Sequence, residues 1–370
     1  MMLKAVFVFI VAVHGLIHVM GFAKAYKLAE LSQLKQDIPR SSGVLWLLAA
    51  ALFFVSLGLM LMKVQMWWLF GAAAVLLSQL LIVMSWRDAK YGTLPNIIIL
   101  IPVIIAFVNI LPSSFANTYR SEVKKRLTPA AVVSLVTEQD LQRLPVPVQR
   151  YLRYVGAVGK PRVTNFRAVS QGTMKRSIKS DWIDITAHQY DFFDNRARLF
   201  FIESSLYGVP FDGLHMYVGN EATMRIRVAS LFPIVHAQGE KMTRAETVTL
   251  FNDMCLLAPA ALIDTSIQWE TVDSLKVRAR FTNRGNTIGA ELVFNEKGEM
   301  TDFISNDRYL SADGKTYESY PWSTPVKDYR DFGGMKVAAY GEAIWHMPEG
   351  EYSYAKFDVK EIEYNCSEFR

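Results

Sequence analysis

The sequence is poor in cysteine and has none of the residue spacings that hold metal ions. Its 370 residues include only two cysteines, Cys255 and Cys366. Two cysteines do not form a disulfide framework, and no Cys/His spacing resembles that of a zinc site. We therefore expect neither a metal nor another cofactor. Cys255 falls on an apolar helical stripe and is interpreted as a small core residue, with a Cys255–Cys366 bridge as the alternative.

Concentrated basic charge and catalytic motifs are also missing. The net charge of +5 is modest for this length, and the cations do not gather into one patch with stacking aromatic residues, so no nucleic-acid partner is predicted. No Gly-x-Ser-x-Gly nucleophile elbow occurs. The histidines after residue 112 stand alone, without a partner at catalytic or metal-ligand spacing. These absences favour a binding protein over an enzyme.

Apolar residues, in contrast, are abundant, and the excess lies almost entirely before residue 112. Hydrophobic residues make up 51% of the chain, and the mean hydropathy is +0.15. The apolar runs are Leu3–Ala23, Val44–Met62, Met66–Ser85 and Leu94–Leu111. The first three approach the roughly 20 residues that cross a bilayer as a helix, whereas the fourth is shorter and carries Pro102. We predict a transmembrane domain of about four helices over residues 1–112, with the fourth crossing fully or in part.

The cations of the short loops predict the orientation of this domain. Lys24, Lys27, Lys35, Arg40, Arg87 and Lys90 lie on one side, and Lys4 and Lys63 on the other. By the positive-inside rule, the N-terminus and residues 113–370 then lie outside the cytoplasm. Cations at residues 120–126 argue for the opposite orientation, but large domains cross a membrane largely regardless of such charges.

Two histidines inside the first apolar run are candidates for a ligand or relay role. His14 and His18 are four residues apart and share one helix face. Histidines within a membrane segment are functional candidates, as axial ligands or in a proton relay. The alternative is hydrogen bonding between helices beside Gly15 and Gly21, which let neighbouring helices approach closely.

The second half of the chain alternates apolar and polar residues at period two, as in Leu275–Phe281. Such alternation is typical of antiparallel strands with one face on a core. A slip in the pattern near Lys360–Glu361 predicts a β-bulge. One long helical signal interrupts the series at residues 243–258, where Thr243 and Glu246 fit a capping box.

This arrangement predicts an α+β domain over residues 128–370, after a linker at 113–127. Short helices are expected over residues 128–156. About eleven strands are expected to form a curled antiparallel sheet wrapped around the central helix at 243–258, because a single apolar helix within a long antiparallel series needs a sheet to cover it.

Aromatic side chains crowd the last third of the chain and supply large apolar surfaces. The candidates to line a ligand cavity are Phe251, Met254, Trp269, Tyr309, Trp322 and Trp345. A core filled by the same side chains is the alternative. Glu246 and Asp253 are seven residues apart, which suits two carboxylates across a substrate, or simply a helix cap and an arginine partner.

Several motifs resemble those of a bacterial family of domains of unknown function. They are Arg150-Tyr-Leu-Arg-Tyr-Val-Gly156, Met224-Arg-Ile-Arg with Leu231-Phe-Pro-Ile-Val235, Trp269-Glu270, Asp307-Arg-Tyr309, Pro321-Trp322, Gly341-Glu342 and Tyr364-Asn365. They cover about residues 137–366. The order of elements is also similar to that of the LolA/LppX lipoprotein-carrier half-barrels, in which a sheet encloses an apolar cavity.

The resemblances imply a membrane-anchored binding protein for a lipid or another lipophilic ligand, on the outer side of a bacterial cytoplasmic membrane. Its expected partners are the bilayer and that ligand. Two alternatives remain: an envelope hydrolase that uses Asp or Glu, and a sensory or interaction module with a filled core. A cavity would distinguish the first hypothesis from the last, and paired titratable groups within it would favour the hydrolase.

Overall fold

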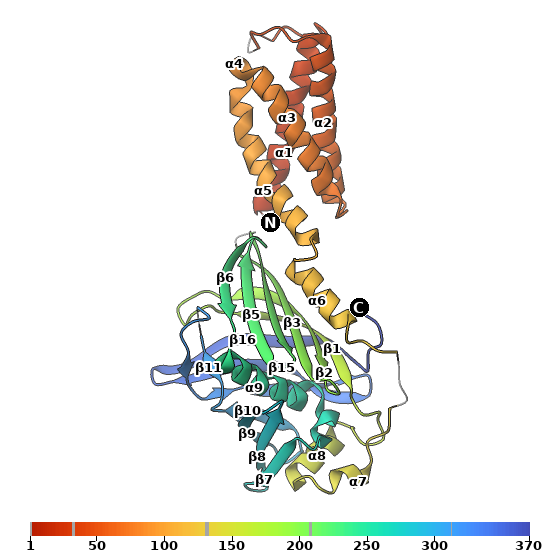
Figure 1. Ribbon diagram of the computed structural model, residues 1–370, viewed down its shortest axis with the longest axis vertical. Coiled ribbons are helices and arrows are strands. Elements are labelled where there is room, and N and C mark those ends of the chain that lie inside the picture. Colours follow the sequence, from red (N-terminus) through yellow and green to blue (C-terminus); the bar gives the residue numbers. More distant parts are fainter. Residues whose placement is uncertain (1, 32–33, 130–132, 207–208, 312) are drawn as a thin grey trace. The chain divides into compact units, whose positions relative to one another are not determined.

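The structure is a computed structural model that describes residues 2–31, 34–129, 133–206, 209–311 and 313–370. It divides into two compact units, which meet in the sequence between Ser114 and Phe115. Helices form the first unit, and a large sheet dominates the second (Figure 1).

Among its described residues, the first unit contains four helices that are long and apolar enough to cross a membrane, by length and composition. They are α1 (Met2–Ala25), α2 (Arg40–Leu61), α3 (Trp67–Met84) and α5 (Thr93–Ile110), with the short α4 (Trp86–Ala89) and η1 (Lys90–Gly92) before α5. The prediction of four apolar helices is confirmed. Pro102 lies inside α5 without interrupting it.

Small residues let these helices approach closely. A Cβ atom added to Gly21 would overlap the Trp46 ring of α2, and one added to Gly43 would overlap the Ala25 side chain of α1. Close backbone approach through glycine is typical of helices that pack within a bilayer, where dispersion contacts replace the hydrophobic effect.

In its described residues, the second unit is built on a fourteen-stranded antiparallel sheet, in the order β6-β5-β4-β3-β2-β1-β16-β15-β13-β10-β9-β8-β7, with β14 pairing β15 in addition. The first ten strands are β1 (Asn165–Met174), β2 (Ile183–Phe192), β3 (Ala197–Leu206), β4 (Val209–Val218), β5 (Glu221–Val228), β6 (Phe232–Ala237), β7 (Ile267–Thr271), β8 (Lys276–Asn283), β9 (Asn286–Phe294) and β10 (Met300–Ser305). The others are β13 (Trp322–Ser323), β14 (Val326–Phe332), β15 (Met335–Met347) and β16 (Gly350–Tyr364). A separate hairpin pairs β11 (Tyr309–Leu310) with β12 (Glu318–Ser319).

The predicted curled antiparallel sheet is confirmed, although about eleven strands were expected. The bulge is confirmed too: Val169 pairs with Glu361 and Ser170 with Val359, so Lys360 is the extra residue. Helix α9 (Glu240–Leu257), followed by the 3-10 helix η2 (Pro259–Ile263), contacts β5 as well as β9, β10 and β15, which belong to opposite arms of the sheet (Figure 1).

The predicted capping box at the start of this helix is wrong. The helix begins at Glu240, after Gly239 with φ +93° as its N-cap. Thr243 lies inside the helix, and its Oγ1 accepts a hydrogen bond from the Ala222 amide of β5 at 3.1 Å. Glu246 is bonded to Arg198 instead of to the helix start. Both side chains that the sequence pattern assigned to a helix cap are thus hydrogen-bonded to other parts of the fold.

The segment predicted as a linker contains a helix, α6 (Phe115–Lys124). Phe115, Tyr119 and Val123 recur every four residues and are buried against β2, β3 and β4 strands of the sheet. Because polar residues separate these three, the sequence alone did not indicate an apolar helical stripe. The short helices expected over 128–156 are present as α7 (Glu138–Leu141) and α8 (Val146–Tyr154), and residues 130–132 lie outside the described part.

Candidate functional site

Along strands β2–β5, the face toward α9 changes from polar to apolar in ordered rows. Cross-strand pairing places the following residues side by side: Tyr217, Arg198 and Asp191 in the first row; His215, Phe200 and Gln189 in the second; Ile226, Gly213, Ile202 and Ala187 in the third; Phe211, Ser204 and Ile185 in the fourth. The first row meets α9, where Tyr217 Oη lies 3.0 Å from Thr247 Oγ1.

Arg198 is the centre of the polar rows. Its Nε donates to Asp253 Oδ2 at 2.6 Å, and its Nη1 donates to Glu246 Oε2 at 3.1 Å. The Arg198 and Glu246 side chains are only 6% and 2% exposed. A charge at this depth is tolerated only when it is paired and hydrogen-bonded, so the three side chains form one unit that joins β3 to α9.

A third carboxyl group, that of Asp191, extends this unit. Gln189 Nε2 donates to Asp253 Oδ2 at 2.7 Å and to Asp191 Oδ1 at 3.1 Å. Burial, and then repulsion from Asp253, raises the pKa of Asp191 well above its ordinary value. Burial raises the pKa of Asp253 as well, but Asp253 accepts from both Arg198 and Gln189, so the pKa of Asp191 is raised further than that of Asp253.

The pKa of Glu246 is shifted in the opposite direction, downward. Burial alone would raise its pKa, but Arg198, and after it His215, lower the pKa of Glu246 to about 2. His215 Nδ1 lies 3.6 Å from Glu246 Oε1, and the His215 side chain is more exposed than Glu246, at 16% against 2%. His215 is therefore the member of the cluster nearest to solvent, at the boundary with the apolar rows.

Arg308 approaches the same carboxylate from the segment between β10 and β13. Its positive charge is among the causes that lower the pKa of Glu246. Its Nη1 donates to Tyr354 Oη at 2.6 Å, and its guanidinium lies 4.2 Å from the centre of the Trp322 ring. Arg308 and His215 thus add positive charge or a ring nitrogen near Glu246 from two different elements.

The apolar rows form a cluster of their own, separate from the main core. Ile185, Ala187, Phe200 and Ile202 are buried in it, with Met174 and Phe357 packed against them. Side chains project little from the middle of the third row, because Gly213 has no side chain and Ala187 has only a methyl group. A Cβ atom on Gly213 would meet only ordinary contacts, 3.8 Å from Ile202 Cβ and 3.9 Å from Ile226 Cγ1.

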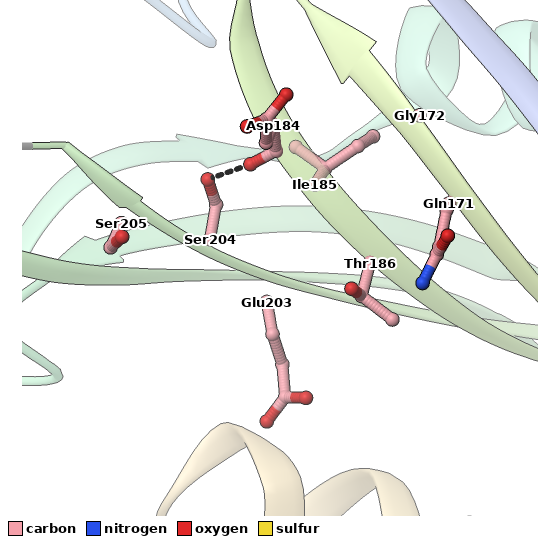
Figure 2. A pocket seen from close by; sticks show the side chains of 8 residues that line it. All are labelled: Gln171, Gly172, Asp184, Ile185, Thr186, Glu203, Ser204 and Ser205. Atoms are coloured by element: carbon pink, nitrogen blue, oxygen red, sulfur yellow. Dashed lines mark hydrogen bonds between the residues drawn. The ribbon is translucent and has the colours of Figure 1, made fainter. Parts of the chain in front are cut away.

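A hollow of about 560 Å³ lies at the far end of these rows. It is lined by Gln171, Gly172, Asp184, Ile185, Thr186, Glu203, Ser204 and Ser205. Figure 2 shows Gln171, Thr186 and Glu203 extending from one side of the strands, and the Ser204 hydroxyl donating to the Asp184 carbonyl oxygen. This hollow is polar, and it was not among the sites expected from the sequence.

Four of the predicted ligand-lining residues lie in the main core. Phe251 and Met254 are 0% exposed, and Trp322 and Trp345 are 2% and 3% exposed. The Phe251 ring stacks on Phe281 at 5.0 Å between centroids. These contacts are those of a filled core at this position, which was the alternative interpretation of the same residues.

The other two predicted residues are more accessible and lie apart from each other. Trp269, on β7, lines a second hollow of about 230 Å³ together with Arg143, Leu144, Asp264, Thr265 and Ile267. Tyr309 is half-buried on β11, where its ring meets that of Tyr317 at 6.4 Å. The structure therefore does not bring the six candidates together around one cavity.

His14 and His18 are buried between the helices of the first unit. His14 Nε2 lies 2.9 Å from Asn96 Oδ1 of α5, and His18 Nε2 lies 2.8 Å from Ser78 Oγ of α3. His18 Nδ1 donates to the His14 carbonyl at 2.8 Å. This is the interhelical hydrogen bonding that the sequence left as the alternative to a ligand or relay role. No group of three or more His, Cys, Asp or Glu in the described residues is arranged to hold a metal ion.

Sequence reasoning missed Arg198, Asp191 and Gln189. Asp253 and Glu246 were singled out, and an arginine partner for Asp253 was one of the two interpretations; Arg198 is that partner. The available signal was the density of polar residues on β2 and β3, which an outward-facing strand would show equally well.

A family model with the description "Family of unknown function (DUF6544)" matches residues 134–357, and the chain belongs to this family. The membership indicated by the sequence motifs is thus confirmed. A search among curated proteins finds no match.

Three solved structures have a similar fold. A putative outer membrane lipoprotein-sorting protein domain from Vibrio parahaemolyticus has 7% identity and a TM-score of 0.32, with 54% of this chain and 85% of that one covered. A LolA superfamily protein from Nitrosomonas europaea has 9% identity and a TM-score of 0.35, with 60% and 94% covered. A DUF1329 family protein from Desulfovibrio piger has 10% identity and a TM-score of 0.31, with 59% and 91% covered. The resemblance to lipoprotein-carrier folds is found again, at TM-scores too low to carry an argument about a ligand.

Proposed function

We propose that residues 115–370 bind a lipid or another lipophilic molecule that carries a polar group, and that the apolar helices hold this unit at a membrane. The observation that carries the proposal is the change from charged to apolar rows within one face of the sheet. A hydrocarbon chain would lie over the third and fourth rows, where burial of apolar surface stabilises it. Its polar group would meet the boundary at His215.

The boundary suits a group that accepts hydrogen bonds. His215 and Arg308 approach Glu246 from different elements, and both carry N–H donors. Gly213 contributes no side chain to the third row, and a Cβ atom there would meet Ile202 and Ile226 only at ordinary contact distances. Sites for small molecules combine such an apolar lining with a few placed polar groups.

Native mass spectrometry of the full chain, released from membranes into detergent, tests the proposal. We expect a co-purified lipid-sized adduct on the wild-type protein, and its loss from Gly213→Leu, which fills the floor of the third row. Gly289→Leu is the matched control: its Cβ would lie 3.6 Å from Asp307 Oδ2 and belongs to a different strand, β9, so the adduct should remain. A wild-type protein without adduct, or equal retention by both variants, contradicts the proposal.

A second candidate is a non-catalytic interaction module with a filled core. The packing of Phe251 against Phe281 and Phe303, and the burial of Trp322 and Trp345, favour it. The same measurement separates the two functions, because a filled module would carry no adduct. A hydrolase has less support: Glu246 and Asp253 are both bonded to Arg198 and are buried beneath the sheet.

We also propose that residues 113–370 lie outside the cytoplasm, in a bacterial cytoplasmic membrane. The loop cations support this orientation. A C-terminal alkaline phosphatase fusion should then be active and a C-terminal green fluorescent protein fusion dark. The reverse pattern would place the sheet in the cytoplasm.

A further inference from the structure

The end of the β5–β6 hairpin exposes large apolar side chains. Phe232 is 64% exposed and Ile234 52%, with Leu231 at 36% and Val209, at the start of β4, at 42%. Few other large apolar side chains in the described part of the second unit are as exposed, and those lie on separate loops and helices. A cluster of this kind is typical of a surface that meets a membrane or a protein. We call these four residues the apolar tip.

The hairpin turn keeps this tip short. Ala229 and Ser230 both have positive φ, at 53° and 55°, and Leu231 N donates to Val228 O at 3.2 Å across the turn. Such turns favour Asn and Gly, so Ala and Ser adopt this conformation at an energetic cost. The result is a two-residue turn, with Leu231 and Phe232 directly after it rather than a polar loop.

The strand that bears this tip contacts α6, which follows the last apolar helix closely in the sequence. Phe232 pairs with Val228, and the neighbouring Arg227 places its guanidinium carbon 4.1 Å from the centre of the Phe115 ring. Phe115 begins α6, and only residues 111–114 separate it from Ile110, the end of α5. These residues span at most about 18 Å when fully extended. Phe115, which Arg227 contacts, thus follows the end of a helix of membrane length after only four residues of chain.

We propose that the apolar tip enters the interfacial layer of the bilayer, where Leu231, Phe232 and Ile234 contact lipid. Arg225 and Arg227 project from β5 on the face that carries α6, where both lie over Phe115. At the base of the tip they meet lipid headgroups, and Arg is attracted to anionic ones. This contact is independent of ligand binding, and it makes the tip a second attachment of the chain to the membrane.

Depth measurements on the full chain in proteoliposomes test this proposal. Phe232→Cys and Ile234→Cys are labelled with an environment-sensitive fluorophore; the native Cys255 and Cys366 are buried. Val272→Cys is the matched control, since Val272 is also exposed and apolar but follows β7, at the opposite edge of the sheet. We expect lipid-attached quenchers to remove most of the emission at 232 and 234, and aqueous iodide to do so at 272.

Two results overturn the proposal. One is iodide quenching at 232 and 234 equal to that at 272, which would show a solvated tip. The other is protection from iodide that disappears when the protein is diluted with excess lipid, which would show that a second copy covers the tip. The adduct measurement described above for Gly213→Leu is unaffected by either result, so the two proposals fail separately.

Discussion

Replacement of Arg198 by methionine should strongly destabilise the second unit. The substitution keeps an unbranched apolar stem but removes the guanidinium charge that Glu246 and Asp253 share. Their side chains are 2% and 10% exposed, so water cannot take the place of the guanidinium. Removal of one partner from a buried ion pair costs about 3–5 kcal/mol, and here two carboxylates lose their partner. We therefore expect a loss at or above the upper end of that range.

A neutral network should recover most of this loss. In a triple variant, Arg198→Met is combined with Glu246→Gln and Asp253→Asn, so no buried charge is left unpaired. Buried ion pairs replaced by well-packed apolar residues of similar volume are often as stable as the original, because the charges no longer need to be desolvated, and the Gln and Asn amides remove the same cost here. The triple variant should thus be more stable than the single one by about 2 kcal/mol or more.

Pulse proteolysis of the full chain in detergent, over a urea series, measures these differences as free energies of unfolding. Arg278→Met is the control, because the Arg278 side chain is 58% exposed and its ion pairs are at 3.7 Å and 4.0 Å. It should change stability by less than about 1 kcal/mol. The reasoning fails if Arg198→Met costs no more than this control, or if the triple variant is no more stable than Arg198→Met.

Three further predictions use other parts of the same unit. Asp191→Asn should remove a pH dependence of stability, because the folded-state pKa of Asp191 is raised. The contribution of Asp191 to stability is complete below the ordinary carboxyl pKa of about 3.9 and is lost as the pH rises through the folded-state pKa. Urea unfolding from pH 4 to pH 8 should therefore show the wild type losing stability relative to the variant. Thr243→Ala should lower the free energy of unfolding in urea by about 1–3 kcal/mol, because the buried Ala222 amide loses its hydrogen-bond acceptor. Thr243→Ser should keep this hydrogen bond, so equal losses in the two variants would contradict the role of the Thr243 hydroxyl. Val277→Asp should prevent folding, because Val277 is 0% exposed, whereas Arg278→Glu should leave the circular dichroism spectrum unchanged; a folded Val277→Asp protein would show that the inner face is misassigned.

Where one face of a strand meets solvent, the sequence predicted the fold well. On β8, Val277, Ala279 and Phe281 alternate with exposed residues, and these three are buried. The slip at Lys360 likewise marked a true bulge, because one residue added to an alternating pattern shifts every later side chain to the other face. The apolar helices were equally clear, since a membrane span needs a long run without charge.

The α6 helix explains why the arm from β1 to β5 was harder to interpret. It covers the outer face of β2 and β3, so Tyr190 and Leu199 are buried on that side while Gln189 and Arg198 are buried on the other. With both faces covered, burial no longer follows the alternation of polar and apolar residues. The same helix was missed because its apolar stripe is only three residues long within a polar segment, and its stability comes from the sheet on which it packs.

Arg198 and Arg278 show why the polar cluster could not be found in the sequence. Each arginine stands between two apolar residues on a strand, and in isolation each pattern indicates an arginine that faces solvent. On β8 the apolar neighbours Val277 and Ala279 are buried in the main core, and Arg278 is exposed. On β3 the neighbours Ala197 and Leu199 face α6, which directs Arg198 inward to Glu246 and Asp253. The identity of the inner face is set by which side of the strand each helix covers, and this is tertiary information. The polar rows therefore follow from the packing of α6 as much as from the residues that form them.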